Sequence, residues 1–441
     1  MAARRRSRRS CAPPVEARIE TLSHDGRGIA RLEGKTVFVD GALPGERVLL
    51  RYRSQRRSFD EGEVVEVMES SPLRRSPKCP HFGACGGCSL QHLDGGAQIE
   101  AKQRVLLDNL RRLGGVAPDA VLPPLTGPAW GYRRKARLGV KYVRKKGRVL
   151  VGFRERHSAL VADLQRCEVL HPSVGERIAD LAALIASLEA RERIAQIEVA
   201  VSDDTTALVL RNLDPLSDTD RARVAAFGRA QRLQMWLQPA GPDSAQPLEA
   251  DAPPLTYRLP EADVTLEFTP TDFTQINAAV NNAMVTSALT LLEPQGRRVL
   301  DLFCGLGNFT LPLARQARAV VGVEGDSGLI ARAVGNAARN GIGNVRFHTC
   351  DLAGPLDQEP WIGEGFDRVL LDPPRSGALE VLPALGRLGA ERVVYVSCHP
   401  ATLARDVGLL VQQHGYRLQA AGVMDMFPHT AHVESIALLV R

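Results

Sequence analysis

The sequence predicts an α/β protein of several domains, with a doubly wound parallel sheet in its C-terminal third. At 441 residues the chain is long enough for two or three domains. Its first part alternates apolar and polar residues in short segments between turns, which is typical of a small β-barrel. From residue 298 onwards, runs of β-branched residues alternate with helix-like segments, which is typical of an open parallel sheet.

The composition excludes several classes of protein. Hydrophobic residues make up 44% of the chain and charged residues 24%, as in ordinary globular domains. No apolar run reaches the roughly 18 residues of a membrane-spanning helix, and the N-terminus lacks the apolar core of a secretory signal. Eight cysteines scattered along the chain favour a reducing cytoplasm over a disulfide framework. The sequence gives no sign of membrane association or of an obligate protein partner.

The N-terminal region is basic. Residues 1–14 form an arginine-rich tail that we expect to be disordered, where it either adds phosphate contacts or only increases solubility. Residues 15–73 are predicted to form five short strands, the first over Arg18–Leu22, in a barrel of the oligonucleotide-binding type. Arginines gather in and after the fourth strand, where they suit a nucleic-acid backbone or form a solvated rim: Arg47, Arg51, Arg53, Arg56 and Arg57.

A central α+β domain is predicted over residues 74–262, and it opens with a glycine-rich cysteine loop. Cys79, Cys85 and Cys88 are separated by five and two residues, which lets three thiols converge on one metal centre. A fourth ligand is needed, and Cys167 is the nearest later cysteine. Thiolates suit zinc or an iron–sulfur cluster. The tight loop favours a cluster, whereas in a zinc site His81 can replace a thiol.

The rest of the central domain contains the most basic segment of the chain. After a helix at 96–113, which we expect to pack on the C-terminal domain, a hairpin is predicted to turn at Lys145–Gly147. Between residues 132 and 156, eleven lysines and arginines accompany one acid, with aromatic residues among them. Cationic groups and aromatic faces are what an unpaired RNA segment needs, while a merely solvated hairpin is the alternative. Residues 172–240 are predicted as a helix at 174–188, two strands, a second helix and a last strand.

The C-terminal domain, residues 263–441, has the strongest pattern. A strand at 298–303 leads into the turn Cys304–Asn308, whose glycines let a ligand approach the backbone closely. The next strand ends in Glu324, at the spacing of an acid that binds ribose hydroxyls. Later strands lead to Asp351 and Asp372, and an antiparallel hairpin at 418–424 and 433–440 ends the chain.

One thiol stands at the end of a further strand of this sheet. The apolar run Val393–Val396 predicts a buried strand that ends at Ser397 and Cys398, and Pro400 prevents its continuation. Open α/β sheets hold their ligands at the carboxyl ends of their strands. A thiolate at Cys398 is therefore a candidate nucleophile, with a buried structural cysteine as the alternative.

Together these motifs resemble the RNA uracil-C5 methyltransferases. The turn Asp301–Phe309 and Glu324 look like the cofactor site of S-adenosylmethionine-dependent methyltransferases, and the narrower resemblance rests on Phe273–Asn277, Asp372–Arg375, Ser397–Pro400 and Asp425–Glu434. The resemblance covers nearly the whole chain. Residues 15–67 resemble a TRAM domain, and this barrel with the cysteine loop resembles the large-subunit rRNA branch, whose target is uracil 1939 of bacterial 23S rRNA. One departure is His399, where the family usually has Asn.

The resemblance implies a fold, cofactors and residue roles. It implies a Rossmann-like class I methyltransferase domain, S-adenosylmethionine and a [4Fe–4S] cluster as cofactors, and 23S rRNA as the partner. Cys398 matches the nucleophile, Glu434 the general base and Phe273 a residue that stacks on the uracil. The matching cofactor contacts are Gln275, Phe303, Asn308, Glu324, Asp351 and Asp372, and the matching cluster ligands are Cys79, Cys85, Cys88 and Cys167.

The expected chemistry follows from the substrate. Uracil C5 is a poor nucleophile, but attack of the Cys398 thiolate on C6 creates an enolate that makes C5 reactive towards a sulfonium methyl group. C5 then carries a methyl group and a hydrogen, so a base, Glu434, must remove the proton before the thiolate leaves. The uracil must also be splayed out of the RNA to be reached.

Other hypotheses fit parts of the sequence. A nicotinamide dehydrogenase uses the same glycine turn but leaves Cys398 and Glu434 unexplained. An amino-group methyltransferase usually carries Asn-Pro-Pro-aromatic, which Asp372–Arg375 lacks. A non-catalytic RNA-binding protein explains only the barrel, the hairpin and the cysteine loop. For the same chemistry, a uridine at rRNA position 747 or a tRNA is the alternative substrate.

Overall fold

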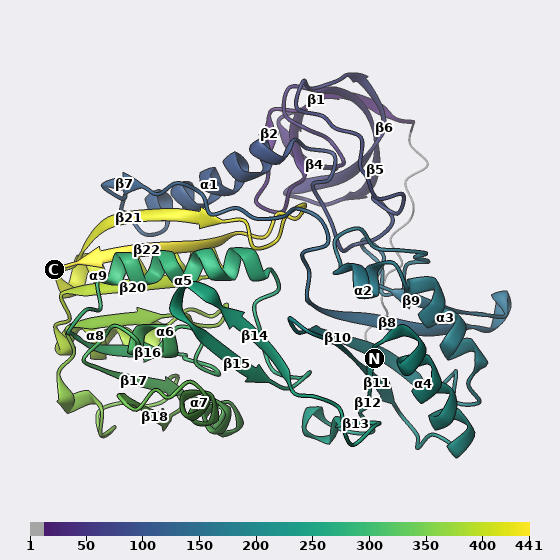
Figure 1. Ribbon diagram of the computed structural model, residues 1–441. Helices are drawn as coiled ribbons and strands as arrows, with labels where there is room; N and C mark the ends of the chain where they lie inside the picture. Colours follow the sequence, from purple (N-terminus) through teal and green to yellow (C-terminus); the bar gives the residue numbers. More distant parts are fainter. Residues whose placement is uncertain (1–12) are drawn as a thin grey trace, which may run out of the picture. The chain divides into compact units, whose positions relative to one another are not determined.

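The computed structural model describes residues 13–441, so most of the predicted basic tail lies outside the described residues (Figure 1). The chain forms two compact units. The first runs to Lys102 and includes Glu155–Ser158 and Phe427–His432, and the second contains Gln103–Arg154, Ala159–Met426 and Val433–Arg441. The division into domains at 15–73, 74–262 and 263–441 remains a prediction.

The first unit is built on a barrel-like sheet with the strand order β1-β5-β6-β4-β3-β2. Its strands are β1 (Val15–Arg18), β2 (Thr21–Leu22), β3 (Gly28–Leu32), β4 (Lys35–Asp40), β5 (Arg47–Gln55) and β6 (Phe59–Glu69). The prediction of one strand over Arg18–Leu22 is wrong. The chain changes partner there, because the amide of Ile19 donates to Glu46 O and the amide of Glu20 donates to Ile29 O. Alternate side chains of β4 and β5 fill the core, with Val37, Val39, Val48 and Leu50 buried.

A buried ion pair closes the end of this barrel. Glu46 is fully buried, and Arg74 donates to its carboxylate at 2.6 Å. The amides of Leu43 and Ser71 also donate to it, at 2.8 and 3.2 Å. Burial alone raises the pKa of Glu46, but these hydrogen bonds outweigh it and lower the pKa. The segment that leads to the cysteine loop is therefore fixed to the barrel.

The second unit contains a sheet with the order β13-β12-β11-β10-β8-β9. Its strands are β8 (Lys135–Val143), β9 (Arg148–Gly152), β10 (Ile194–Val201), β11 (Thr206–Asn212), β12 (Gln234–Leu237) and β13 (Gln246–Pro247). The predicted basic hairpin is confirmed as β8 and β9, and Gly147 takes a left-handed conformation (φ 63°) at its turn. Helix α4 (Asp218–Gln231) lies between β11 and β12, as predicted.

The helix predicted over residues 174–188 is divided in two. It forms as α2 (Pro172–Gly175) and α3 (Ile178–Ser187). Gly175 explains the break, because a Cβ there would lie 2.4 Å from the carbonyl oxygen of Cys167, and the Cys167 amide donates to Gly175 O at 2.8 Å. The backbones at Cys167 and Gly175 are therefore in contact. A side chain larger than hydrogen at position 175 would prevent that contact.

A second sheet of this unit has the order β18-β17-β16-β19-β20-β22-β21-β7. Its strands are β16 (Arg298–Leu302), β17 (Ala319–Glu324), β18 (Val345–Thr349), β19 (Arg368–Leu371), β20 (Arg392–Ser397), β21 (Arg417–Met424), β22 (Glu434–Val440) and β7 (Ala120–Val121). The five strands β16 to β20 are parallel, and β22 and β21 form the predicted antiparallel hairpin. The doubly wound α/β prediction is therefore confirmed, and β7 is an edge strand that the sequence did not reveal.

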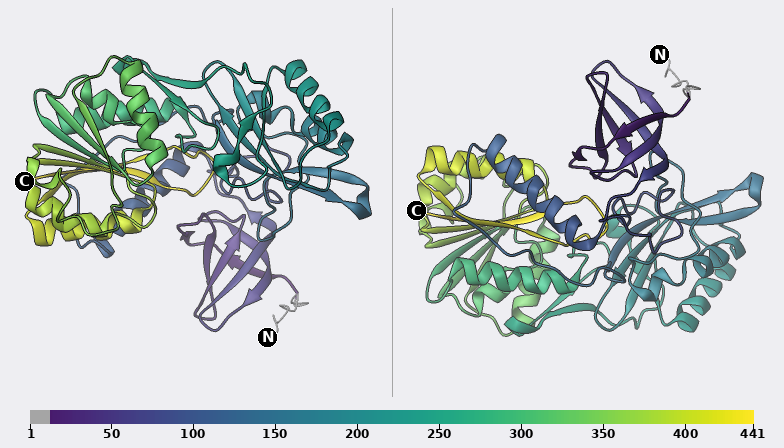
Figure 2. Two further views of the ribbon diagram at one scale, coloured as in Figure 1. Left: turned by 90° about the horizontal axis from the view of Figure 1, so that it is seen from below. Right: turned by 90° about the horizontal axis from the view of Figure 1, so that it is seen from above.

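Helices cover both faces of this sheet. Helices α5 (Ala278–Leu292), α6 (Thr310–Ala314) and α7 (Ser327–Arg339) lie on one face, and α8 (Leu382–Leu388) and α9 (Pro400–His414) lie on the other (Figure 2). In the described chain the link from β18 to β19 contains a 3₁₀ turn, Ile362–Glu364, rather than an α-helix. A separate hairpin, β14 (Leu255–Leu259) with β15 (Val264–Phe268), leads into the sheet.

The helix predicted over 96–113 forms as α1 (Gly95–Arg112). Gly114, just after it, lies against α9, since a Cβ on Gly408 would stand 2.5 Å from Gly114 O. Among the described residues no helix is long and apolar enough to cross a bilayer.

Candidate active site

Strand register brings the predicted cofactor residues to one edge of the parallel sheet. Leu302 of β16 pairs with Val323 on one side and with Leu371 on the other. The residues at the carboxyl ends of these three strands therefore lie at the same edge of the sheet. They are Phe303, which follows β16, Glu324, which ends β17, and Asp372, which follows β19. β18 pairs with β17 through Thr349, so that the exposed Asp351 also follows a strand at this edge.

Cys398 and Glu434 meet at the same edge. β20 and β22 are antiparallel, and their last pair is Ser397 with Ser435. Cys398 directly follows Ser397, and Glu434 directly precedes Ser435, so the two residues lie at the same end of the ladder, beside its last pair. The thiol is half-buried, and Glu434 is buried.

The thiol of Cys398 is in an acidic environment. Burial raises its pKa to about 11, and the charges of Glu434 and Asp372 add to this shift. Arg375 acts in the opposite direction and lowers the pKa. At neutral pH the thiol is therefore protonated in the protein without ligands.

Asp372 is the most strongly shifted acid of the group. Burial raises its pKa well above the usual range, and Glu434 and Asp301 raise it further. Burial disfavours the charged form of a carboxyl, so Asp372 favours its protonated form. The charges of Glu434 and Asp372 both act on the thiol of Cys398.

The glycine turn after β16 has the shape expected for close approach of a ligand. Phe303 has a left-handed backbone (φ 64°), as do Gly305 (φ 55°) and Gly307 (φ 98°). A Cβ on Gly305 would meet no atom within 4 Å, so open space lies over the backbone there. The carboxylate of Glu324 accepts from the Gly305 amide at 3.1 Å. This cradle and its carboxylate suit the ribose of a nucleoside cofactor such as S-adenosylmethionine.

Two side chains that the sequence did not single out support this turn. The carboxamides of Asn308 and Asn281 exchange two hydrogen bonds at 3.0 Å, and the Tyr257 hydroxyl donates to Asn308 at 3.0 Å. Asn281 also lines a small cavity of about 20 Å³ with Gln275, so the partner of Asn308 lies near a second predicted cofactor residue. Asn281 is buried among the apolar residues of helix α5, but the helix also carries Asn282 and several hydroxyl side chains, so the sequence alone did not single Asn281 out.

Asp301 was also not assigned a role. It is fully buried at the end of β16, and the Thr310 hydroxyl donates to it at 2.5 Å. Burial raises its pKa to about 7. This pair connects the strand to α6 across the glycine turn and so holds the turn in place.

Phe273 extends into solvent from the loop between β15 and α5. Its side chain is 70% exposed, although Asp272 beside it is buried. An exposed aromatic ring is suited to stacking on a base.

His399, the departure from the family pattern, caps a helix. It is the N-cap of α9, and its Nδ1 accepts from the Thr402 amide at 3.4 Å. An Asn side chain performs the same function at an N-cap. The cap therefore explains why His and Asn can both follow the thiol.

The predicted metal ligands are less well supported. Cys79, Cys85, Cys88 and Cys167 are half-buried thiols, and the Gly87 amide donates to Cys85 Sγ at 3.4 Å. Among residues 13–441, however, no group of three or more His, Cys, Asp or Glu side chains is assembled as a metal site. The cluster therefore stays a prediction, and no chemical step is built on it.

The basic hairpin is more neutral than its sequence suggests. Four of its arginines form ion pairs with acids: Arg134 with Asp203, Arg137 with Glu198, Arg144 with Glu192 and Arg148 with Asp163. These pairs are mostly exposed, so each contributes little stability and can exchange for a phosphate. The hairpin is consistent with an RNA surface, but less cationic than the count of residues implies.

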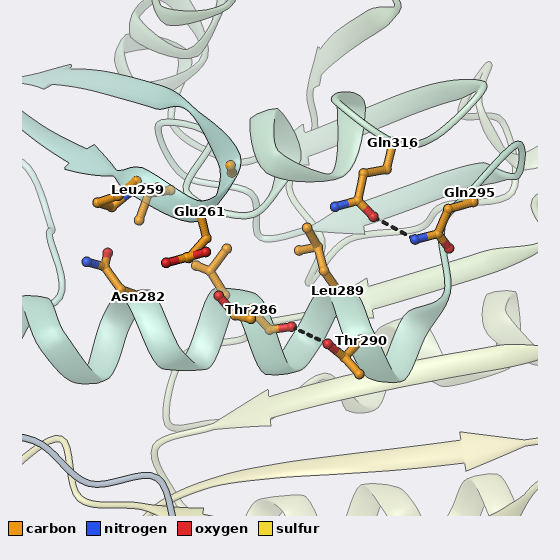
Figure 3. Close-up of a pocket in the computed structure, with 11 residues that line it drawn as sticks. Leu259, Glu261, Asn282, Thr286, Leu289, Thr290, Gln295 and Gln316 are labelled. Atoms are coloured by element: carbon orange, nitrogen blue, oxygen red, sulfur yellow. Dashed lines mark hydrogen bonds between the residues drawn. The ribbon is translucent and has the colours of Figure 1, made fainter.

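A larger pocket lies elsewhere, on the outer side of α5 (Figure 3). It has a volume of about 310 Å³, and a hydrogen bond between Gln295 and Gln316 at 2.7 Å crosses one end. It is lined by residues of α5, the β14–β15 turn and two loops: Leu259, Pro260, Glu261, Ala262, Asn282, Val285, Thr286, Leu289, Thr290, Gln295 and Gln316. The predicted site residues do not line it, so it is separate from the candidate active site.

Comparison with known proteins identifies the class. The family described as tRNA (uracil-5-)-methyltransferase matches residues 176–352 and 364–441, and the TRAM domain matches residues 14–51. The chain belongs to this methyltransferase family and is an enzyme of that class. The crystal structure of the Pyrococcus abyssi tRNA (uracil-54, C5)-methyltransferase in complex with S-adenosyl-L-homocysteine has a similar fold, with a TM-score of 0.73 at 24% identity over 96% of this chain and 99% of that one.

Proteins with sequences highly similar to this chain point to one branch of the family. The chain is 58% identical to the 23S rRNA (uracil(1939)-C(5))-methyltransferase RlmD of Alkalilimnicola ehrlichii, over 99% of both chains. It is 55% identical to the protein of the same name from Methylococcus capsulatus and 54% identical to that from Stenotrophomonas maltophilia, over 98% and 97% of both chains. The predicted resemblance to the large-subunit rRNA branch is therefore confirmed.

Proposed function

We propose that this protein uses S-adenosylmethionine to methylate C5 of uridine 1939 in 23S rRNA, and that it acts in the cytoplasm. The observation that carries the proposal is the position of Cys398 and Glu434 at the same end of β20 and β22, at the sheet edge that also holds the glycine turn. A thiol and a carboxylate at the same end of two paired strands can act on neighbouring ring atoms of one uracil. The relatives named RlmD supply the choice of RNA and of position.

Cys398 begins the reaction by adding to C6 of the uracil. A new S–C6 bond forms, the C5–C6 double bond opens, and the electron pair is delocalised over C5 and the C4 carbonyl as an enolate. C5 then attacks a sulfonium methyl group, whose carbon–sulfur bond would break with its electron pair left on the sulfur of a neutral thioether. Glu434 removes the remaining C5 proton, the S–C6 bond breaks and the double bond is restored. Cys398 is released as a thiolate, and it takes up a proton from solvent to return to the thiol of the free protein.

The acidic environment sets a condition for the first step. Burial and the charges of Glu434 and Asp372 raise the pKa of the thiol, so Cys398 must lose its proton as substrate binds. Arg375 is the neighbouring cation that favours the thiolate. A positively charged sulfonium near these carboxyls also lowers the cost of the thiolate. We therefore expect both the RNA and the cofactor to be bound before the Cys398 thiolate attacks the uracil.

The cofactor contributes an electrophilic methyl group when it is bound. Glu324 is placed to hold its ribose hydroxyls, and Phe303 and Gly305 leave room for it beside the backbone. Asp351 and Gln275 complete the proposed contacts. Asn308 is held by Asn281 and Tyr257, so its role is to fix the turn as well as to touch the cofactor.

Phe273 is proposed to stack on the splayed uracil, and the first unit and the basic hairpin to bind the surrounding RNA. Cys79, Cys85, Cys88 and Cys167 are proposed as [4Fe–4S] ligands, on the basis of their spacing and the family resemblance. We assign the cluster a structural role, because the methyl transfer needs no electron.

The decisive experiment maps 5-methyluridine in rRNA. A strain from which the gene is deleted should lack the modification at position 1939, and the intact gene should restore it, whereas a Cys398→Ala gene should not. Loss of methylation at position 747 or in tRNA, with 1939 unchanged, would reject the proposed substrate while keeping the chemistry.

A further inference from the structure

We propose that Lys135 is a positioning residue for the RNA substrate: it fixes the loop Thr269–Asn277 so that Phe273 is presented to the target uracil. Lys135 belongs to the basic hairpin, whose sequence suggests phosphate binding. Its contacts point to a different role. This role rests on the proposed function, because it assumes that Phe273 receives a base.

The loop needs external support to present an exposed ring. Phe273 is 70% exposed, so the ring has little packing of its own to hold it in one orientation. A mobile aromatic ring binds a base more weakly than a fixed one, because the conformational entropy of the ring and its loop is lost on binding. The residues that fix the backbone on either side of Phe273 therefore determine how well it binds a base.

Lys135 holds the side of the loop that precedes Phe273. Its Nζ donates to the carbonyl oxygen of Pro270. Lys135 begins β8 and is paired with Ala200 of β10, so it extends from the end of a strand that lies between β10 and β9 in the sheet. Its side chain is half-buried, unlike Lys141 further along the same strand, which is exposed. The ammonium thus connects a rigid strand to the loop instead of facing solvent.

A second set of contacts, from helix α7, also holds the loop. Asp272 is buried, accepts from the Thr269 amide at 2.6 Å and forms an ion pair with Arg332 of α7 at 2.6 Å. The far end of the loop is fixed by a backbone bond from the Arg134 amide to Ile276 O at 2.8 Å. Phe273 therefore stands between Pro270, which Lys135 of β8 holds, and Ile276, which the Arg134 amide holds. Asp272 beside it is held by Arg332 of α7.

The charges around Lys135 support this role. Burial lowers its pKa to about 8, Glu198 of β10 and Asp272 of the loop raise it, and Arg137 of β8 lowers it. At a pH below this pKa, the Lys135 ammonium binds the Pro270 carbonyl and attracts Asp272. At a pH above it, the amine is neutral and its attraction to Asp272 is lost. The hold of Lys135 on the loop is therefore expected to weaken as the pH rises from 7 to 9.

The test compares steady-state constants of the full-length protein on an rRNA fragment. Lys135→Met should raise KM for RNA about tenfold, while kcat and KM for S-adenosylmethionine change less than twofold. Lys135→Arg should restore the RNA KM to within twofold of the wild type. Lys141→Met is the matched control, and it removes the same charge from the same strand without touching the loop. Equal increases in RNA KM for Lys135→Met and Lys141→Met would overturn the proposal, because bulk charge would explain both.

A double-mutant cycle separates positioning from a direct RNA contact. If Lys135 acts through Phe273, the double variant Lys135→Met with Phe273→Ala should bind RNA no more weakly than Phe273→Ala alone. Multiplicative losses would overturn the proposal. If Lys135→Met does not fold, Lys135→Gln keeps a hydrogen-bond donor, and a lower melting temperature with an unchanged RNA KM would make Lys135 merely structural. No effect from either Phe273→Ala or Cys398→Ala would instead reject the proposed function.

The pH profile adds an independent readout. The RNA KM of the wild type should rise between pH 7 and 9 relative to that of Lys135→Arg, which stays charged. Titration of the RNA bases affects both proteins alike and cancels in this ratio. An identical pH dependence in the two proteins would contradict the role of the ammonium.

Discussion

Cys398 and Glu434 lie at the same end of the antiparallel strands β20 and β22, although the helix α9 and the strand β21 separate them in sequence. The charge of Glu434 contributes to the raised pKa of the Cys398 thiol. The same proximity lets one act at C6 and the other at C5 of a uracil. Three of the following predictions test this pair directly.

The first prediction concerns the covalent adduct. With RNA that carries 5-fluorouracil, the fluorine at C5 cannot leave as a proton does, so the reaction should stop with Cys398 joined to C6. The adduct should survive denaturing gel electrophoresis in the presence of S-adenosylmethionine. Cys398→Ala should form none, and Cys304→Ala is the control that removes a buried thiol of the same domain. An adduct in Cys398→Ala would reject the nucleophile.

The second prediction separates methyl transfer from proton removal. Glu434→Gln keeps the shape of the side chain but cannot accept the C5 proton, so turnover should fall by about 10²–10⁴-fold. The methylated RNA–protein adduct should accumulate with natural RNA and be detected by mass spectrometry. Normal turnover in Glu434→Gln would mean that another group is the base.

The third prediction uses the pKa of the thiol. Because burial, Glu434 and Asp372 raise the pKa of Cys398 to about 11, alkylation by iodoacetamide should be slow at pH 7 and increase throughout the range to pH 10. Glu434→Gln removes a negative charge and should lower this pKa, so that alkylation at pH 8 becomes faster. The Cys398→Ser protein supplies the background from other thiols. A plateau below pH 8 in the wild type would contradict the acidic environment.

The fourth prediction concerns the helix cap at His399. Asn is a good N-cap, so His399→Asn should keep activity within about twofold and keep or slightly increase stability. His399→Ala removes the acceptor for the Thr402 amide and should cost about 1 kcal/mol. Urea denaturation followed by circular dichroism measures both variants. If His399→Ala were as stable as the wild type, the cap would contribute nothing.

The fifth prediction tests the cysteine loop. Protein purified without oxygen should be brown, with broad absorption near 400 nm, and metal analysis should find iron and sulfide. Replacement of Cys85 or Cys88 by Ser should remove the colour, whereas Cys350→Ser should not. A colourless protein that contains zinc would reject the cluster and support the zinc alternative.

Much of the fold could be predicted because it depends on local patterns. Buried parallel strands are short apolar runs, and the residues that follow them reach one sheet edge whatever the details of packing. Phe303, Glu324, Asp372 and Cys398 were placed correctly at that edge for this reason. The prediction over Arg18–Leu22 failed because its alternation does not reveal a change of partner strand at Ile19, which hydrogen bonds to distant residues decide.

Other features were beyond the sequence because they depend on contacts between distant residues. The break after Gly175 follows from the approach of the Cys167 carbonyl, and the two-residue strand β7 exists only because β21 offers it an edge. In the sequence, Asn281 is indistinguishable from an ordinary helix residue. Lys135 is likewise indistinguishable from an ordinary surface cation. Their partners, Asn308 and Pro270, lie far away in the sequence.

The sequence by itself determined the α/β order of the C-terminal part and the position of a thiol at the end of a strand, because these depend on residue types and local spacing. The class of enzyme and the roles of the thiol and the acid followed from the resemblance of its motifs to a known family. Only the tertiary structure decided that Cys398 and Glu434 lie at the same end of two paired strands, that most hairpin arginines are already paired and that Lys135 supports the loop of Phe273. The register of paired strands and the burial of charge are set by the whole fold, and no local pattern contains them.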